Sequence, residues 1–459
     1  MEERKLELIV QDVATIMRQI MLEKDIHFGV FTPIEGLHIE VHEEIGKGHN
    51  GITVYEGEYK GNPVAVKTFP CGHVDVEEGT VNFIHMRPHR NVVSIHKVIQ
   101  SYRGYGLIVQ ERCDFSLQNL IVALRPSSDF DMMPGDAPAV VVHKKKLSSL
   151  KDRMRKFELW TANGHPSQTL LKLMEDVALG LDHFHKSGRV HGDLRPENVL
   201  IVKEDHERLS AKLSDAGITG YQTWMGNLAP GRAKQLLHGQ SPTPETDMFC
   251  FGRLLLFCAY DGQHQFDAFR DPDENTKKNS ENHDIEKLDL NVEVKLLIKR
   301  LLNPLPQSRP TISDVLIDPA FWSPSTRMDF LSEFFAIVQK LRGDDPQSMV
   351  LTILSTKKHN FFDVTWKEGW KSGIEDRYLA ILADANVHYN FQSAEHLLRM
   401  VRNAWAHRQE VSAGLEPGES LETFFTKRFP NLLMESYQVA FNYLQRYRYL
   451  GKFFTRDKR

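Results

Sequence analysis

The sequence predicts an α+β core, made of a strand-rich lobe and a helical lobe, followed by an all-α C-terminal module. Short strand-forming stretches follow one another between residues 39 and 67, separated by glycine-containing turns. From Leu170 the apolar residues recur every three or four positions, as on one face of a helix. The chain then continues beyond Phe321 with further helical periodicity. We therefore divide it into residues 1–38, 39–321 and 322–459.

The composition fits a folded protein with two or three domains. Of the 459 residues, 41% are hydrophobic and 26% are charged. The formal net charge of −4 argues against a chain that coats polyanions, but the segment from His396 onward holds 11 Lys and Arg against 6 Asp and Glu. No stretch approaches the roughly 18 apolar residues of a transmembrane helix, so we expect no membrane span.

The cysteines and the N-terminus bear on the compartment. Four cysteines have neither metal-ligand nor disulfide spacing and are expected to be reduced thiols: Cys71, Cys113, Cys250 and Cys258. The N-terminus is charged and mixed in sign, with no small-residue cleavage site after it. We therefore expect a cytoplasmic or nuclear protein.

The predicted elements follow in order along the chain. A helical extension is expected within residues 1–38, where apolar residues stand at near-helical spacing from Leu8 to Met21. Strands are expected next at 41–45, 55–59 and 63–67. Between the two lobes, residues 125–168 are rich in Pro, Ser, Asp and Lys, and this composition predicts a mobile surface insertion.

One set of residues in the core points to nucleotide chemistry. Glycines recur as G-x-G-x-x-G, a lysine lies in V-A-V-K, and H-G-D-L-R-P-E-N precedes D-A-G. A lone glycine motif is weak evidence, but here all the parts stand in the required order. The residues concerned are Gly46, Gly48, Gly51, Val54, Lys67, Asp193, Asn198 and Asp215.

This set resembles the protein-kinase fold, a bilobal α+β architecture, over about residues 39–321. The resemblance implies that ATP or ADP binds with its phosphates at the glycine turn and at Lys67. It also implies that Asn198 and Asp215 hold Mg²⁺, and that Asp193 orients the acceptor hydroxyl. The remaining matches are with the hinge beneath adenine and with the helix that braces the catalytic loop: Glu111, Cys113 and residues 247–252.

Several positions depart from the kinase pattern. Gly192 stands where active kinases usually carry an arginine that binds the phosphate of a phosphorylated activation loop. Arg195 replaces the catalytic-loop lysine, and a planar guanidinium is not an equivalent point charge. Residues 229–231 read Ala-Pro-Gly instead of A-P-E, and either Glu77 or Glu78 could be the acid that pairs with Lys67. Nucleotide binding is expected, whereas phosphoryl transfer does not follow.

The C-terminal module contains two predicted helices. The first covers residues 328–338, where apolar residues are periodic. The second covers residues 394–406 with Ser393 as its N-cap, and it buries a stripe of Leu397, Leu398, Val401 and Trp405. Asn403 and His407 then lie one turn apart on one face, with Arg402 beside them.

These residues, together with Tyr389 and the stretch from Phe424 to Tyr437, resemble the ribonuclease (KEN) module that follows the kinase domain in another family. That family is the inositol-requiring kinase/endoribonuclease of the unfolded-protein response, whose plant forms are most similar, and ribonuclease L is similar as well. The resemblance implies cleavage of stem-loop RNA without a metal, by attack of the 2′-hydroxyl on the adjacent phosphate. It implies that His407 and Tyr389 transfer protons, while Arg402 and Asn403 bind the phosphate.

The module also departs from its family. The lysine-containing stretch after Asn403 is replaced by Ala404-Trp405-Ala406, and Arg408 stands where an aromatic residue commonly follows the histidine. The family's lumenal sensor and membrane span are not expected in this chain.

Three hypotheses for function remain open at this point. The first is an endoribonuclease whose kinase-like domain is a nucleotide-gated dimerisation scaffold. The second is a catalytically weak regulator that pairs with a full-length relative. The third is a serine/threonine kinase acting on itself, with acceptors in the activation segment at Thr219, Tyr221 and Thr223. The partners expected are stem-loop RNA and a second copy or a full-length family member.

Overall fold

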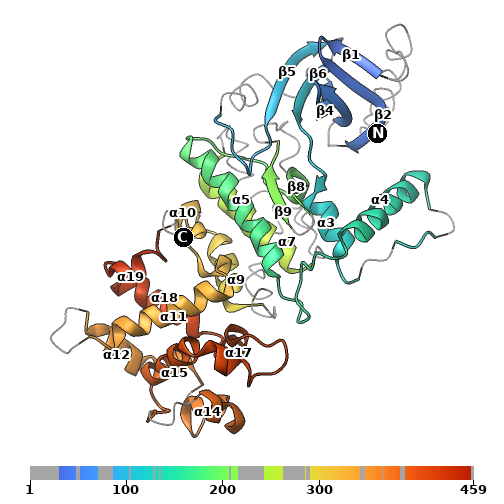
Figure 1. Cartoon of the computed structure of the whole chain (residues 1–459). Helices are drawn as coiled ribbons and strands as arrows, with labels where there is room; N and C mark the ends of the chain where they lie inside the picture. Colours follow the sequence, from blue (N-terminus) through green and yellow to red (C-terminus); the bar gives the residue numbers. More distant parts are fainter. Residues whose placement is uncertain are drawn as a thin grey trace. The chain divides into compact units, whose positions relative to one another are not determined.

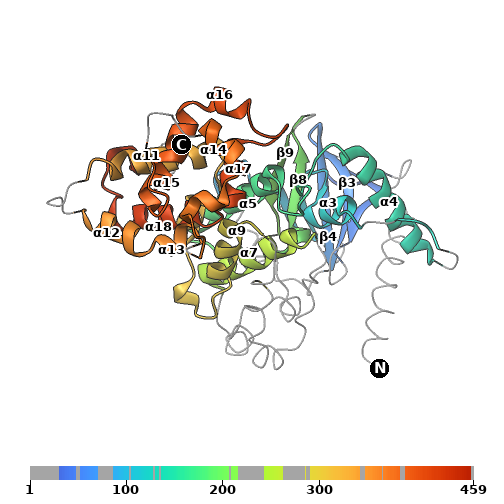
Figure 2. The same cartoon turned by 90° about the horizontal axis from the view of Figure 1, so that it is seen from below.

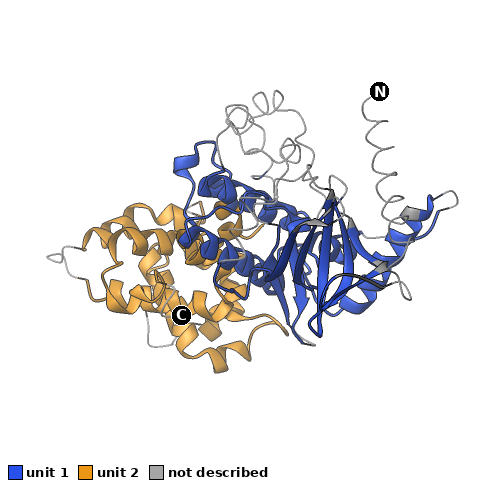
Figure 3. Ribbon diagram, turned by 90° about the horizontal axis from the view of Figure 1, so that it is seen from above, with its two compact units in different colours: residues 1–287, 298–312 blue, residues 288–297, 313–459 orange. Residues whose placement is uncertain are grey.

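The computed structural model describes residues 30–47, 52–70, 86–102, 105–127, 130–133, 136–205, 208–215, 242–261, 285, 290–341, 347–363, 365–382 and 388–455. The chain divides into two compact units, shown in different colours in Figure 3. Unit 1 consists of residues 1–287 and 298–312, and unit 2 of residues 288–297 and 313–459. Among the described residues, no helix combines the length and apolar character that crossing a bilayer requires.

Unit 1 begins with a six-stranded antiparallel sheet in the order β1-β2-β3-β4-β6-β5 (Figure 1). Its inner face is apolar because alternate residues of the central strands point the same way, for example Val64 and Val66, which are fully buried. The strands are β1 (Val30–Ile34), β2 (Leu37–Lys47), β3 (Thr53–Tyr59), β4 (Asn62–Pro70), β5 (Ile95–Tyr102) and β6 (Tyr105–Glu111). This is the strand-rich lobe that the sequence predicts.

Residues 30–38 correct the predicted N-terminal helix. They form β1 and the start of β2, which pair antiparallel with Val30 opposite Glu40 and Ile34 opposite Leu37. Gly36 has φ of 75°, a conformation that glycine adopts without strain and that permits the tight turn between the strands. The apolar residues that predicted a helix lie before residue 22, outside the described residues.

The second lobe of unit 1 is mainly helical (Figure 2). Helix α5 (Gln168–Lys186) is capped by Ser167 and buries the predicted apolar face, including Leu170, Leu173 and Val177. It packs against a small sheet of β7 (Phe115–Ser116), β8 (Val199–Lys203) and β9 (Leu209–Leu213). The other elements are α3 (Leu117–Leu124), η1 (Pro196–Asn198), α7 (Pro244–Ala259) and η2 (Pro306–Ser308).

The segment 125–168, predicted to be a mobile insertion, contains a helix. Helix α4 (Pro138–Met154) carries Leu147, Leu150 and Met154 at helical spacing, and all three are buried. The helix packs against α3. The polar composition of the segment concealed this apolar stripe, because only three of the seventeen helical positions form it.

Unit 2 is all helical, as predicted. Helix α11 (Pro324–Val338) packs against α15 (Ala394–Ala406). Helix α11 contains the helix predicted at 328–338, and α15 has the bounds predicted for the second helix, 394–406. The Ser393 N-cap is confirmed, since its Oγ accepts from the backbone N–H of His396 at 3.3 Å. The remaining helices are α12 (Met349–Thr356), α13 (Lys358–Phe361), α14 (Asp376–Leu382), α16 (Arg408–Ser412), α17 (Leu421–Arg428), α18 (Leu432–Tyr443) and α19 (Arg448–Gly451), with short turns η3 (Pro319–Phe321) and η4 (Gly369–Gly373).

A buried ion cluster stands at the start of α11. Arg327 is 4% exposed and donates to Glu422 of α17 at 2.9 Å, while its Nη1 lies 3.8 Å from the carboxylate of Glu293, which is 1% exposed. Burial raises the pKa of Glu293, and the charge of Arg327 opposes that rise. Glu293 belongs to α9 (Val292–Leu301), whose first six residues are grouped with unit 2 and whose last four are grouped with unit 1. In α10 (Ile312–Leu316), the first residue is grouped with unit 1 and the others with unit 2.

We expect Arg327→Ala to destabilise unit 2 by about 3–5 kcal/mol, because it leaves the buried carboxylate of Glu293 without its cation. The loss should shrink as the pH falls from 7 towards 5, since Glu293 can then take up a proton and become neutral. Urea denaturation at both pH values measures this. The exposed, paired Arg377 is the matched control, and Arg377→Ala should change stability little. A pH-independent loss in Arg327→Ala would contradict the electrostatic explanation.

Candidate active sites

Three strands bring part of the predicted nucleotide site together. Val54 of β3 is paired with Gly46 of β2 on one side and with Lys67 of β4 on the other. The pairing follows from the hairpins β2–β3 and β3–β4, which turn the chain back on itself twice. Gly48 and Gly51, the other glycines of the motif, lie outside the described residues.

Lys67 is buried and contacts the two residues that follow β9. Its Nζ donates to Ser214 Oγ at 3.1 Å and forms an ion pair with the carboxylate of Asp215. Asp215 has φ of 62°, an unusual value for a non-glycine residue and one often found at functional sites. The two candidate partners from the sequence, Glu77 and Glu78, lie outside the described residues, so which of them pairs with Lys67 stays open.

Asp193 and Asn198 form the centre of the catalytic loop. Asn198 Nδ2 donates to the Asp193 carboxylate at 2.8 Å and to its backbone carbonyl at 2.9 Å. Burial raises the pKa of Asp193 to about 6, although the charge of Arg195 and the Asn198 hydrogen bond oppose the rise. The site therefore holds a carboxylate that can exchange a proton near neutral pH.

Asp247 of α7 fixes the backbone of this loop. Its buried carboxylate accepts from the backbone N–H groups of His191 and Gly192 at 2.8 and 2.9 Å, and it lies 2.9 Å from His185 Nε2. Gly192 has φ of 78°, so glycine suits this position sterically. His191 Nδ1 accepts from the Asp193 N–H at 3.2 Å, which leaves Nε2 to donate to the Ser214 carbonyl at 3.0 Å. Burial lowers the pKa of His191, which favours this neutral form.

The Arg195 side chain, which stands at the position of the catalytic-loop lysine, is paired with a neighbouring carboxylate. Its guanidinium donates twice to Glu197, at 2.9 Å from Nε and 2.8 Å from Nη2. A bidentate pair of this kind holds the guanidinium plane in one orientation. The Arg195 guanidinium is therefore bound to Glu197 in this structure.

Asn198 and Asp215 carry side-chain oxygens of the kind that binds Mg²⁺. Asn198 uses its amide N–H groups on Asp193, which leaves Oδ1 for a cation, and Asp215 supplies a carboxylate close by in the loop that follows β9. Carboxylate and amide oxygens are the ligands that Mg²⁺ prefers. When bound, the ion would neutralise charge on the phosphates, and Lys67 is the cation that would meet them.

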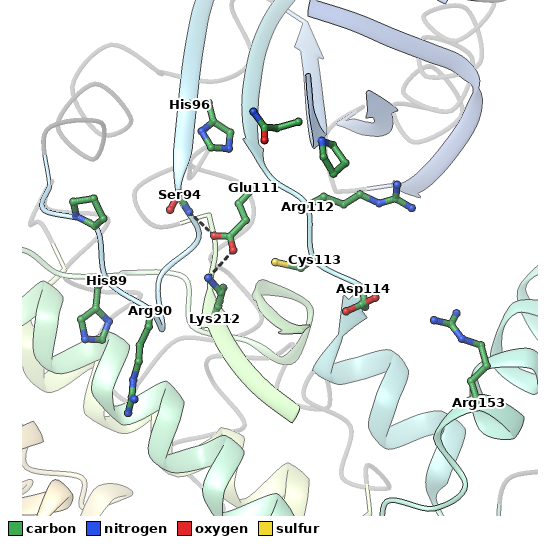
Figure 4. Close-up of a pocket in the computed structure, with 13 residues that line it drawn as sticks. His89, Arg90, Ser94, His96, Glu111, Arg112, Cys113, Asp114, Arg153 and Lys212 are labelled. Carbon is green, nitrogen blue, oxygen red and sulfur yellow. Dashed lines mark hydrogen bonds and ion pairs between the residues drawn. The ribbon is translucent and has the colours of Figure 1, made fainter. Parts of the chain in front are cut away.

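The hinge between the lobes borders a separate pocket of about 850 Å³, drawn in Figure 4. Glu111 extends into it, where its carboxylate accepts from Lys212 at 2.6 Å and from the Ser94 backbone N–H at 3.2 Å. Cys113 also lines the pocket, and burial raises the pKa of its thiol to about 12. Lys67, Asp193 and Asp215 do not line it, so the Glu111 side chain is engaged away from the predicted phosphate site.

Unit 2 holds a second constellation of polar side chains. Asn403 Nδ2 donates to Tyr389 Oη at 3.0 Å, and Asn403 Oδ1 accepts from Arg402 Nη1 at 3.0 Å. Three of the four predicted ribonuclease residues therefore form one hydrogen-bonded chain. Asn403 is oriented by both neighbours, and the Tyr389 oxygen receives a donor that would stabilise negative charge on it.

His407, the fourth predicted residue, lies at the C-terminal end of α15. Its backbone N–H donates to Asn403 O at 3.1 Å, and its imidazole is 66% exposed. The imidazole Nδ1 lies 3.9 Å from the carboxylate of Glu410. Among the described residues, no hydrogen bond joins the His407 ring to the other three, so it stands next to the network and open to solvent.

His396 is a site residue that the sequence reasoning missed. It lies two turns before Asn403 on α15, and its Nδ1 accepts from the backbone N–H of Asn390 at 2.9 Å. Its ring also meets the Tyr389 ring edge-on, with centroids 6.5 Å apart. His396 therefore anchors the loop that carries Tyr389. The helical spacing of 396 and 403 was the signal that could have found it.

Two families match the two parts of the chain. The family described as protein tyrosine and serine/threonine kinase matches residues 39–318, and the family described as ribonuclease 2-5A matches residues 327–454. The activation segment of the first part lies outside the described residues, including Thr219, Tyr221, Thr223 and 229–231.

Whole proteins that combine both parts are also similar. The serine/threonine-protein kinase/endoribonuclease IRE1b of Arabidopsis thaliana is 32% identical over 90% of this chain and 47% of its own length. IRE1a of the same plant is 32% identical, over 90% of this chain and 50% of its own length. The chain thus spans about half the length of these curated relatives. A third Arabidopsis protein, named inactive serine/threonine-protein kinase/endoribonuclease IRE1-like, is 30% identical over 86% of this chain and 74% of its own length.

We expect Asp193→Asn to stabilise unit 1 by about 1–3 kcal/mol at pH 7.5. The raised pKa means that the ionised carboxylate is less favourable in the folded state than in the unfolded state, and an amide removes that penalty. The gain should fall between pH 6 and pH 4, where the wild-type group becomes protonated. Thermal unfolding at several pH values measures this. The same change at the exposed Asp152 should bring no such gain, and a pH-independent gain at 193 would contradict the explanation.

Proposed function

This chain belongs to the IRE1 kinase/endoribonuclease family, and from that premise we propose that it is an endoribonuclease that cleaves stem-loop RNA. The observation that carries the proposal is the hydrogen-bonded chain from Arg402 through Asn403 to Tyr389, with His407 one turn further along α15. In acid–base cleavage of a phosphodiester, a phenol and an imidazole can transfer protons, while a cation and an amide can bind the phosphate.

The proposed reaction needs no metal because side chains supply the proton transfers. The ribose 2′-hydroxyl passes its proton through the Tyr389 hydroxyl to water, and its oxygen attacks the adjacent phosphorus. The bond from phosphorus to the 5′-oxygen breaks, and His407 protonates the leaving oxygen. The products are a 2′,3′-cyclic phosphate and a 5′-hydroxyl. Arg402 and Asn403 bind the phosphate as its negative charge develops.

The kinase-like domain is proposed to bind ATP or ADP with Mg²⁺ and to favour pairing of two chains. Lys67, Asn198 and Asp215 are the residues assigned to phosphates and metal, and Glu111 and Cys113 to the hinge beneath adenine. A nucleotide that binds the paired state more tightly shifts the equilibrium towards it. Paired ribonuclease modules would offer a folded RNA two sets of contacts.

A second candidate function is a regulatory partner with little activity of its own, which pairs with a full-length relative. Two observations favour it. A relative named inactive is 30% identical over 74% of its length, and Arg195 is held by Glu197 where a lysine would otherwise stand. Transfer of the γ-phosphate to the chain itself remains a third proposal, which labelled ATP tests directly.

We predict that ATP with Mg²⁺ raises the melting temperature, since a ligand selective for the folded state stabilises it. Lys67→Ala should reduce the shift because it removes the cation that meets the phosphates. Differential scanning fluorimetry measures the shift, and sedimentation in the same samples reports whether the dimer fraction rises. No shift with ATP or ADP at millimolar concentration would exclude a nucleotide site in the cleft.

We predict that His407→Ala slows cleavage of stem-loop RNA by about a hundredfold to ten-thousandfold, the range for loss of a general acid. His359→Ala replaces an exposed histidine of α13 in the same unit and is the matched control, with full activity expected. Gel analysis of end-labelled RNA gives the rate, and a 2′,3′-cyclic phosphate should terminate the 5′ product even with EDTA present. Undetectable cleavage by the wild type on varied stem-loops would leave the regulatory partner as the better proposal.

A further inference from the structure

Two residues that replace the family's usual side chains beside His407 contact each other. The Arg408 guanidinium lies over the Trp405 ring with its carbon 5.0 Å from the ring centroid. Its Nη1 also donates to the Trp405 backbone carbonyl at 3.2 Å. Trp405 lies in the last turn of α15 and Arg408 is the first residue of α16, so the two stand on either side of His407 in the sequence. The aromatic ring and the guanidinium form a stacked pair.

The indole is itself held from the other direction. Trp405 Nε1 donates to Asp329 Oδ1 of α11 at 2.8 Å, and the ring is partly buried against the core of unit 2. The Trp405 ring is therefore anchored to α11, a long helix of the unit 2 core. A guanidinium that stacks on an anchored ring loses little further conformational freedom when it binds a ligand.

The charge of Arg408 is not neutralised within the described part of the chain. No carboxylate there lies within 4 Å of its guanidinium, and the side chain is exposed. Arg402, on the other side of His407, likewise donates only to the neutral amide of Asn403 among the described residues. Arg408 uses one N–H on the Trp405 carbonyl, which leaves several donors in its planar fork for an anion.

We propose that the Trp405–Arg408 pair is a second RNA contact, in which Arg408 binds a backbone phosphate next to the one that is cleaved. The inference rests on the proposed ribonuclease function and adds to it the residue that holds the strand at the cleavage site. Arg408 takes no part in proton transfer. Trp405 is a positioning residue, because it orients the guanidinium rather than touching the strand.

The test separates RNA binding from RNA cleavage by using two forms of one stem-loop. A 2′-O-methyl version lacks the attacking hydroxyl and reports affinity by fluorescence anisotropy, while the unmodified version reports kcat and KM. The control is Arg377→Ala. Arg377 is also an exposed arginine stacked on an aromatic ring, 4.4 Å from the centroid of Tyr378, but Glu416 pairs with it at 2.8 Å.

Arg408→Ala should weaken binding of the 2′-O-methyl RNA about fivefold to tenfold, as expected for one lost charge-assisted contact. The slope of log affinity against log salt should fall by about 0.7–0.9, because one fewer phosphate is neutralised. KM should rise with kcat unchanged. Arg408→Lys should keep the slope, and Trp405→Ala combined with Arg408→Ala should be no worse than Arg408→Ala alone, because the two residues act as one contact.

The outcomes that overturn the proposal are distinct. If wild type binds and cleaves RNA but Arg408→Ala behaves like Arg377→Ala, the pair is not an RNA contact and the ribonuclease function stands. If wild type neither binds nor cleaves RNA, both proposals fall. If RNA affinity is unchanged while Arg408→Ala loses self-association in sedimentation, the pair belongs to a protein interface. Because Arg408 is exposed, its replacement tests the idea even if Trp405→Ala unfolds.

Discussion

The charge of Arg327 is a constraint on which the C-terminal module depends. The Arg327 guanidinium and the Glu293 carboxylate are withdrawn from water beside the first turn of α11, and each alone would be costly to bury. Glu422, which is partly buried, is the second carboxylate of the cluster. Helix α11 is also the helix against which α15 packs, and α15 carries Arg402, Asn403 and His407. The position of the proposed ribonuclease residues therefore rests on a helix whose start is fixed by charge balance.

The two candidate sites differ in how far their polar side chains are exposed to water. In the kinase-like part, Asp193 and His191 are withdrawn from water, and burial shifts the pKa of each towards its neutral form. Lys67 and Asp215 neutralise each other as an ion pair. In unit 2, His407 and both neighbouring arginines face solvent, and the charges of the two arginines are not withdrawn from water.

The elements that were predicted correctly from the sequence are those whose bounds are set by local signals such as caps and apolar spacing. For residues 394–406 the N-cap Ser393 and the apolar spacing agreed, and the observed helix has the same bounds. The helix expected through residue 38 was wrong at 30–38, because strand pairing and the turn at Gly36 determine that segment. The bond between Arg195 and Glu197 and the anchoring of Asn390 by His396 depend on side-chain geometry that spacing does not specify. The network around Tyr389 was suggested by family resemblance, and its hydrogen bonds could only be seen in the folded chain.

The half-buried thiol of Cys113 bears on the design of chemical probes for this protein. Electrophilic compounds react with thiolates, and burial raises the pKa of Cys113 to about 12, so the thiol stays protonated at neutral pH. A covalent warhead aimed at this cysteine would therefore be slow, however well it fits. The adjoining pocket offers the Glu111–Lys212 ion pair instead, so selectivity for this protein is better sought through reversible polar recognition than through bond formation.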